Sequence, residues 1–337
     1  MEKLSVNLHP NLSAAVLKKL SQNQRNTIAD FLQEEVEKLS NISKLDIASI
    51  LEVRDRIFKQ YAASLIEGTT LLEKYLIEDR FLKTGIKGLD SILNGGIPIG
   101  FLSEICGLAG SGKSQLCMQL AINCAMSSNS SVLYIDTKQD FSAVRIQKTL
   151  EAYGLSHKDM ALIMLKINIV QIFSMKELIK LFENIKNKKT VFNNLCLIIL
   201  DSLPCLIFQH FGDDNKIGLK YLNIFVNLAR YISKEFRISI VCVNIETRWV
   251  DQEQVPDLED EDNNYSYSHF GEPAYFEKKN RCLGKYWRSI PALVLRLEKN
   301  LGSDTEYCLS IKVIAENCNN PCSELQCCLS ITHLGVT

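Results

Sequence analysis

The sequence lacks long hydrophobic runs, and neither sign of charge is in clear excess. No stretch of about 18 or more apolar residues occurs, and the segment after Met1 has no apolar core of the kind found in signal peptides. The formal net charge of −1 excludes a global attraction to polyphosphate, so any nucleic-acid binding would depend on local patches. We therefore expect a protein of the cytosol or nucleus that makes no use of a membrane.

The 12 cysteines among 337 residues are too few for a disulfide scaffold, in which cysteine exceeds about 8%. Most of them, such as Cys117, Cys196 and Cys242, lie in apolar runs, where a thiol packs as a small hydrophobic group. Four more lie near the C-terminus, at Cys318, Cys322, Cys327 and Cys328. This cluster lacks the paired Cys-x-x-Cys spacing of zinc sites, and adjacent residues of a strand point to opposite faces. We therefore favour packing over a metal site.

Hydrophobic periodicity divides the chain into a small helical part and a larger α/β part. Ile28, Phe31 and Leu32 begin an amphipathic stripe after the capping candidates Asn26 and Thr27. A second stripe uses Leu45, Ile47, Ile50, Leu51 and Ile57. We predict an N-terminal helical domain, a linker and a core domain over residues 1–57, 58–80 and 81–337.

Apolar strand-like runs alternate with helical stretches after residue 81. The strand-like runs occupy residues 102–106, 132–135, 195–200 and 238–243. The helical stretches occupy residues 114–127, 142–152, 174–186 and 217–235. Such alternation is typical of a parallel sheet that is covered by helices on both faces. Three further strand-like runs, at 292–297, 306–314 and 325–331, should extend one edge of the sheet as antiparallel hairpins.

A glycine-rich segment between the first strand-like run and the next helix fits GxxxxGK[ST] at every fixed position. It consists of Gly107, Leu108, Ala109, Gly110, Ser111, Gly112, Lys113 and Ser114. Glycines let successive backbone N–H groups turn toward phosphate oxygens, and the following helix presents its positive N-terminal end. Lys113 would neutralise the β- and γ-phosphates, and the Ser114 hydroxyl would bind Mg²⁺. We predict an ATP site that runs from this loop through Gln115.

A carboxylate at the end of another buried strand is expected to complete such a site. The apolar run of residues 197–200 ends in Asp201, where the corresponding aspartate of P-loop proteins holds the metal ion. An aspartate at a strand end is a weak signal alone, but it becomes specific behind a complete phosphate-binding loop. We predict that Ser114 and Asp201 hold Mg²⁺ together with ATP.

Taken together, these motifs resemble the RecA and eukaryotic recombinase family over essentially the whole chain. The resemblance rests on residues 82–98, 100–105, 115–117, 134–137 and 201–202, and on the strand that ends at Asn244. Within the family, the similarity to the D-type paralogue rests on residues 6–20, 27–32, 172–175, 228–230 and 283–287. The resemblance implies a RecA-like P-loop core with a mainly parallel central sheet and antiparallel C-terminal strands, preceded by a small all-α domain. It also implies ATP and Mg²⁺ as cofactors, related paralogues as partners in a hetero-oligomer, single-stranded DNA bound through that complex, and a nuclear location.

Two positions depart from the pattern of the strand-exchange members. Those proteins carry a glutamate two residues after the position of Asp136, where it polarises the attacking water, and this chain has Lys138 there. They also carry a glutamine after the position of Asn244, where it senses the γ-phosphate, and this chain has Ile245. No residue is therefore assigned a certain catalytic role, and the resemblance implies an accessory paralogue that is at most a weak DNA-stimulated ATPase. An active strand-exchange motor and a P-loop kinase-like enzyme are the alternatives.

By the same resemblance, residues 203–217 and 248–281 correspond to the two loops that meet single-stranded DNA in the active recombinases. The first offers Phe208, His210 and Phe211 beside Asp213 and Asp214. The second carries nine acidic and four basic residues, and its segment 251–262 should repel phosphate. Its last part mixes aromatic and basic side chains that could contact DNA or a partner, at Tyr265, Tyr267, Tyr275, Phe276, Lys278, Lys279 and Arg281.

Overall fold

The computed structural model describes residues 3–62, 66–77, 80–127, 130–210, 216–251, 276–300, 308–317, 325–332 and 334–337. Residues 1–78 form one compact unit and residues 79–337 form a second. The helix α5 (Gly68–Ile77) occupies much of the stretch that the sequence predicts to be a linker. The domain boundaries at residues 57 and 80 stay a prediction.

Four helices of the first unit pack around one small apolar core. They are α1 (Ala14–Gln22), α2 (Ile28–Gln33), α3 (Val36–Ser43) and α4 (Ile47–Tyr61). Thr27 begins α2 with a capping box, because its hydroxyl accepts a hydrogen bond from the Asp30 backbone N–H (3.1 Å) and the Asp30 carboxylate accepts one from the Thr27 N–H (2.9 Å). The expected stripe on α4 is partly wrong, since Ile47 and Leu51 are each 51% exposed. The buried face of α4 instead uses Ile50, Val53 and Ile57.

The second unit is built on a nine-stranded sheet in the order β13-β12-β11-β10-β3-β7-β6-β4-β5. Its parallel strands are β3 (Leu102–Gly107), β4 (Ser131–Asp136), β5 (Ile167–Gln171), β6 (Leu195–Asp201) and β7 (Ser239–Val243). Beside β3, β10 (Leu293–Lys299) is also parallel, and β11 (Cys308–Asn317), β12 (Leu325–Thr332) and β13 (Gly335–Val336) continue the edge antiparallel. The predicted fold class, a mainly parallel sheet with antiparallel C-terminal strands, is confirmed.

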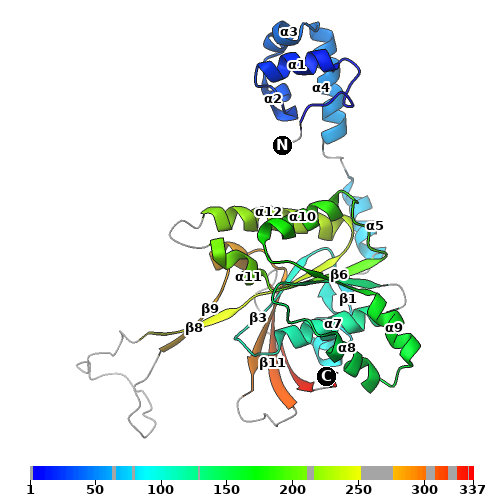
Figure 1. Cartoon of the computed structure of the whole chain (residues 1–337), viewed down its shortest axis with the longest axis vertical. Coiled ribbons are helices and arrows are strands. Elements are labelled where there is room, and N and C mark those ends of the chain that lie inside the picture. The colour runs from blue at the N-terminus through cyan, green and yellow to red at the C-terminus, as the bar shows by residue number, and fades with distance from the viewer. Residues whose placement is uncertain are drawn as a thin grey trace, which may run out of the picture. The chain divides into compact units, whose positions relative to one another are not determined.

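Helices cover both faces of this sheet (Figure 1). One face packs against α6 (Lys87–Ile92), α7 (Lys113–Met126), α8 (Ala143–Ala152) and α9 (His157–Leu165). The other packs against α10 (Met175–Lys186), α11 (Leu203–Ile207), α12 (Lys216–Glu235) and α13 (Gly284–Arg288). Two short elements, β1 (Phe81–Leu82) and β2 (Ile97–Pro98), pair ahead of the main sheet.

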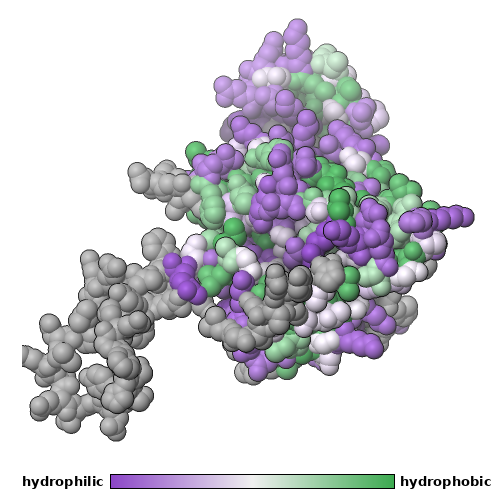
Figure 2. All heavy atoms as spheres, turned by 60° about the horizontal axis from the view of Figure 1, so that its bottom comes forward, coloured by the Kyte–Doolittle hydropathy of each residue, from purple (hydrophilic) through white to green (hydrophobic). Residues whose placement is uncertain are grey.

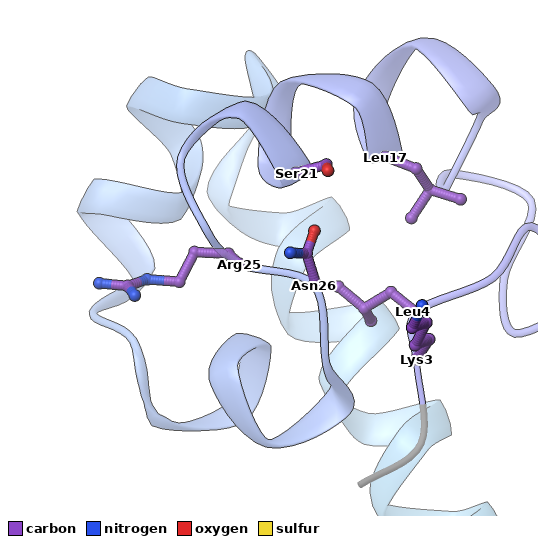
Figure 3. A pocket seen from close by; sticks show the side chains of 6 residues that line it. All are labelled: Lys3, Leu4, Leu17, Ser21, Arg25 and Asn26. Atoms are coloured by element: carbon purple, nitrogen blue, oxygen red, sulfur yellow. The ribbon is translucent and has the colours of Figure 1, made fainter.

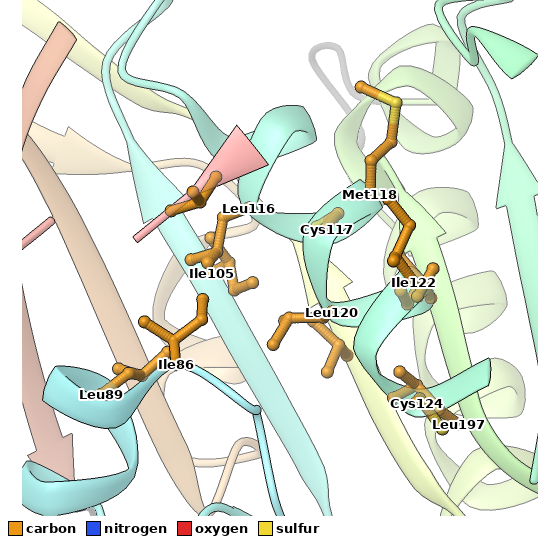
Figure 4. Close-up of a cluster of buried hydrophobic side chains, with 14 of the residues drawn as sticks. Ile86, Leu89, Ile105, Leu116, Cys117, Met118, Leu120, Ile122, Cys124 and Leu197 are labelled. Carbon is orange, nitrogen blue, oxygen red and sulfur yellow. The ribbon is translucent and has the colours of Figure 1, made fainter. Parts of the chain in front are cut away.

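The first face explains why the helix after the glycine-rich loop is firmly held. In Figure 4, Leu116 and Leu120 of α7 lie beside Ile105 of β3, together with Ile86 and Leu89 from the preceding segment. Each of these side chains is at most 4% exposed. Burial of side chains of this size contributes roughly 1.5–3 kcal/mol each, so the core holds α7 against the sheet.

In the part of the chain that the structure describes, no helix is both long and apolar enough to span a bilayer. The face drawn in Figure 2 mixes hydrophilic and hydrophobic side chains over its visible elements. On β12, Cys328 is exposed and Cys327 packs against the core, as expected for neighbours in a strand. Cys318 and Cys322 lie outside the described residues.

Candidate functional site

The glycine-rich loop joins the end of β3 to the start of α7. At several positions its backbone has a conformation that glycine adopts readily and other residues do not. Gly107, Gly110 and Gly112 have φ angles of 153°, 71° and 87°, a region that L side chains rarely adopt. A Cβ at Gly107 would overlap with the Leu297 carbonyl oxygen of β10. One at Gly112 would overlap with the Ile331 side chain of β12. The loop is therefore shaped by the neighbouring strands as well as by its own sequence.

Lys113 follows this loop as the first residue of α7, and its ammonium is held by the loop itself. The Nζ atom donates to the carbonyl oxygens of Gly107 (2.8 Å) and Leu108 (2.6 Å), and Ser111 Oγ lies 3.4 Å away. Burial lowers the pKa of Lys113, and the positive charge of Lys138 lowers it further. An anion in the loop would oppose both effects, which is the role that a phosphate plays in such sites.

The structure brings the two other predicted residues, Asp201 and Lys138, into direct contact. Lys138 Nζ lies 2.8 Å from Asp201 Oδ1, and the Tyr134 hydroxyl donates to Asp201 Oδ2 at 3.0 Å. The Asp201 side chain is 3% exposed and that of Lys138 is 23% exposed. Although burial lowers the pKa of Lys138, the charge and hydrogen bond of Asp201 outweigh it and raise that pKa above its ordinary value. Lys138 is thus an ammonium that neutralises the carboxylate.

A tight turn after β4 directs Lys138 back toward β6. The Asp136 carboxylate accepts hydrogen bonds from the backbone N–H groups of Lys138 (3.0 Å), Gln139 (2.9 Å) and Phe141 (3.2 Å). These bonds wrap the chain around one side chain, as aspartates do in turns. The ends of β4 and β6 are also tied together, because Asp136 pairs with Asp201 in the sheet register. The position of Lys138 is therefore set by the fold.

Thr137 and Ser202 add a second tie at the same place. The Thr137 hydroxyl donates to the Ser202 carbonyl oxygen at 3.0 Å and accepts from the Ser202 N–H at 2.7 Å. Both residues are buried. Two hydrogen bonds of this kind, each worth about 1 kcal/mol net, hold the segment after Asp201 against the segment after Asp136.

Asn244, at the end of β7, belongs to a buried polar cluster that sequence reasoning did not assign. Its Nδ2 atom donates to Glu104 Oε1 (2.8 Å) and to the Cys282 carbonyl oxygen (3.0 Å). Glu104 Oε2 accepts from Trp287 Nε1 (3.0 Å) and lies 3.4 Å from Arg281 Nη1. Burial raises the pKa of Glu104, and its hydrogen-bond partners oppose that effect. In the sequence, the feature that indicates this cluster is a glutamate within the apolar run of residues 102–106.

The segments expected to meet DNA have more regular structure than predicted. In the first, α11 is followed by a 3₁₀ turn at Phe208–His210, and α12 begins at Lys216. The second is bounded by a hairpin of β8 (Glu246–Asp251) and β9 (Phe276–Arg281), so its two ends are paired strands. Phe211, Asp213, Asp214, Tyr265, Tyr267, Tyr275 and the acidic residues from 252 to 262 lie outside the described residues.

A small hollow in the first unit is a separate feature. It has a volume of about 300 Å³ and is lined by Lys3, Leu4, Leu17, Ser21, Arg25 and Asn26 (Figure 3). Glu34 already pairs with the Arg25 guanidinium, with Oε2 lying 2.6 Å from Nε. The hollow therefore has fewer unpaired charges than its lining residues suggest.

The residues present fit a nucleoside triphosphate, since the glycines, the helix N-terminus and Lys113 form one continuous cradle. The expected metal-binding residues fit less simply, because both Asp201 oxygens already have partners. Within the described ranges, no group of three or more His, Cys, Asp or Glu residues could hold a metal ion by itself. A cation here would depend on phosphate oxygens in addition to Ser114 and Asp201.

Comparison with known proteins gives a consistent result. The Rad51 family model matches residues 78–260. The chain is 24% identical over 253 residues to mouse DNA repair protein RAD51 homolog 4, covering 74% of this chain and 77% of that protein. The bovine protein of the same name is 23% identical over 320 residues, which cover 92% of this chain and 91% of that protein. Human DNA repair protein RAD51 homolog 2 is 26% identical over 248 residues, which cover 69% of this chain and 64% of that protein.

Proposed function

The chain belongs to the Rad51 family, and we propose that it is an ATP-binding accessory factor in DNA repair by homologous recombination. In this proposal it assembles with related paralogues in the nucleus and promotes recombinase action on single-stranded DNA. The DNA repair proteins among its relatives support a role in DNA repair, and the glycine-rich loop supports the binding of ATP. The pairing of Lys138 with Asp201 supports an accessory role over that of a motor.

For ATP binding, the proposal assigns the triphosphate to the loop from Gly107 to Ser114 and to Gln115. Backbone N–H groups of the loop would surround the phosphates, and the Lys113 ammonium would exchange loop carbonyls for phosphate oxygens. Ser114 and Asp201 would hold Mg²⁺, which would supply positive charge to the phosphates. Asp201 would also keep Lys138 beside the phosphates.

The observation that carries the accessory role is the ion pair at position 138. Hydrolysis needs a group that orients the attacking water and accepts its proton. An ammonium with a raised pKa accepts no proton, and Asp201 holds this one in place. General-base assistance is typically worth about 10²–10⁴-fold in rate, so we expect ATP to turn over slowly.

Contact with DNA is proposed for the assembled complex. The β8–β9 hairpin places Arg248 opposite Lys279 and Trp249 opposite Lys278, so basic and aromatic residues share its stem. The cluster of Glu104, Asn244 and Trp287 holds the base of this hairpin near the end of β7. Proteins bind single-stranded nucleic acid through basic and aromatic residues. Because this chain has a net charge of −1, a partner that supplies more positive charge would favour DNA binding.

The test is purification of the tagged full-length chain from its own cells, with identification of the proteins that accompany it. We expect at least one other Rad51-family protein. The reconstituted complex should then raise strand exchange by the recombinase on single-stranded DNA, while the chain alone should give none. Strand exchange by the chain alone would contradict the proposal, as would purification without any family member.

A further inference from the structure

The ion pair between Lys138 and Asp201 has a consequence for the metal requirement of the site. A nucleoside triphosphate carries about four negative charges, and P-loop sites ordinarily balance them with a lysine and a divalent cation. Here a second ammonium already lies at the aspartate that is expected to serve the cation. Lys113 and Lys138 are therefore two cations built into the site, and the Lys299 side chain also lies near Gly110 of the loop.

The formal charges show what this exchange achieves. Asp201, Lys113 and Lys138 together carry one net positive charge. With a glutamate at position 138 the same three positions would carry one net negative charge, and a bound divalent cation would bring the sum back to one positive charge. Without a metal ion, these three positions thus carry the same net charge as a glutamate-containing site that has bound one. Burial lowers the pKa of Lys113, and the positive charge of Lys138 lowers it further.

The second ammonium is also fixed in place before any ligand arrives. Asp201 and the turn around Asp136 hold Lys138, and Thr137 ties that turn to the strand end at Ser202. A positioned charge loses little side-chain entropy when an anion binds, so it contributes more than a free surface lysine would. Tyr134 donates to the second Asp201 oxygen, so each oxygen of this carboxylate already accepts one hydrogen bond, and a metal ion would compete with both donors.

We propose that the Lys138 ammonium replaces the divalent cation as a charge partner of the nucleotide, so that this chain binds ATP almost independently of Mg²⁺. The inference rests on the proposed ATP binding and adds to it the identity of the second cation. It concerns affinity alone and involves no chemical step. Asp201 acts as a positioning residue for Lys138.

The experiment measures the dissociation constant of a fluorescent, non-hydrolysable ATP analogue for the full-length chain in Mg²⁺ and in EDTA. For the wild type we expect the two constants to agree within about threefold. Lys138→Gln keeps a hydrogen-bond donor toward Asp201 and removes the charge. We expect this variant to bind at least about tenfold more weakly in EDTA and to recover much of the loss in Mg²⁺, because a lost charge-assisted contact is worth that much.

The matched control is Lys166→Gln. Lys166 Nζ donates hydrogen bonds to the carbonyl oxygens of Ala125 (3.0 Å) and Ser127 (2.8 Å), at the far end of α7. A helix of 14 residues is about 20 Å long, so this ammonium lies well away from the loop. The control should bind with the wild-type affinity in both buffers.

The outcomes distinguish a failure of this inference from a failure of the proposed ATP binding. Wild-type binding that is strong in Mg²⁺ and at least about a hundredfold weaker in EDTA would overturn the inference and leave the proposed ATP binding intact. No binding in either buffer would overturn both. An equal Mg²⁺ dependence in the wild type and Lys138→Gln would also overturn the inference. Should Lys138→Gln fail to fold, the wild-type comparison in the two buffers decides the question by itself.

Discussion

Alanine substitutions at two glycines of the phosphate-binding loop, with Gly154 outside the loop as a reference, test how the loop is held. Gly154 has a φ of 70° and open space where a Cβ would lie, so Gly154→Ala should cost only the left-handed backbone, about 1 kcal/mol. Gly112→Ala adds an overlap with the tip of Ile331, which can rotate, for about 1 kcal/mol more. Gly107→Ala meets the backbone oxygen of Leu297, which cannot move away, so we expect a loss of about 3 kcal/mol or more.

Urea unfolding of the three variants measures these costs, and thermal unfolding should show shifts of about 2–4 °C per kcal/mol in a unit of this size. The double variant Gly112→Ala/Ile331→Val removes the overlapping methyl group. We expect a favourable coupling of about 1 kcal/mol between the two sites, although Ile331→Val alone destabilises by roughly that amount. Equal losses for Gly154→Ala and Gly107→Ala would refute the packing of the loop against β10, and zero coupling would refute its packing against β12.

Three further predictions follow from single features of the chain. Lys113→Ala should abolish binding of a labelled ATP analogue and leave the circular dichroism spectrum unchanged; unaltered binding by the folded variant would refute the P-loop assignment. Burial raises the pKa of Cys124 to about 12, so at pH 8 only about one in 10⁴ of these thiols is ionised. A thiol reagent followed by mass spectrometry should modify the exposed Cys205 first and reach Cys124 faster as the pH rises, whereas equal rates at pH 8 would contradict this burial. Limited proteolysis should cut within residues 58–80, and cutting within 26–57 with the former stretch protected would contradict the domain boundaries.

Local sequence was sufficient to predict the fold class and the glycine-rich loop. The loop is contiguous, and the strands that flank it are unbroken apolar runs, so periodicity identifies them. β5 was missed because it is an edge strand in which buried and more exposed residues alternate, giving no apolar run. β8 and β9 were assigned to a loop because charged residues occupy both strands, and only their pairing reveals them.

The contact between Lys138 and Asp201 was beyond the reach of sequence reasoning. The two residues are 63 positions apart, and their meeting requires both the register of β4 on β6 and the turn around Asp136. The sequence indicated only that a lysine replaces a glutamate. Likewise, Glu104 stands in a buried strand as an isolated carboxylate until Asn244 and Trp287, far along the chain, supply its hydrogen bonds.

The most direct test of the accessory role is the steady-state rate of ATP hydrolysis by the purified full-length chain at saturating ATP, with and without single-stranded DNA. Lys138 provides no general base, and Ile245 stands where a γ-phosphate sensor is expected, so we predict slow turnover that DNA raises by a few-fold at most. Lys138→Glu, measured beside it, should raise the rate measurably and leave the response to DNA weak. Rapid hydrolysis by the wild type, strongly stimulated by single-stranded DNA, would contradict the account.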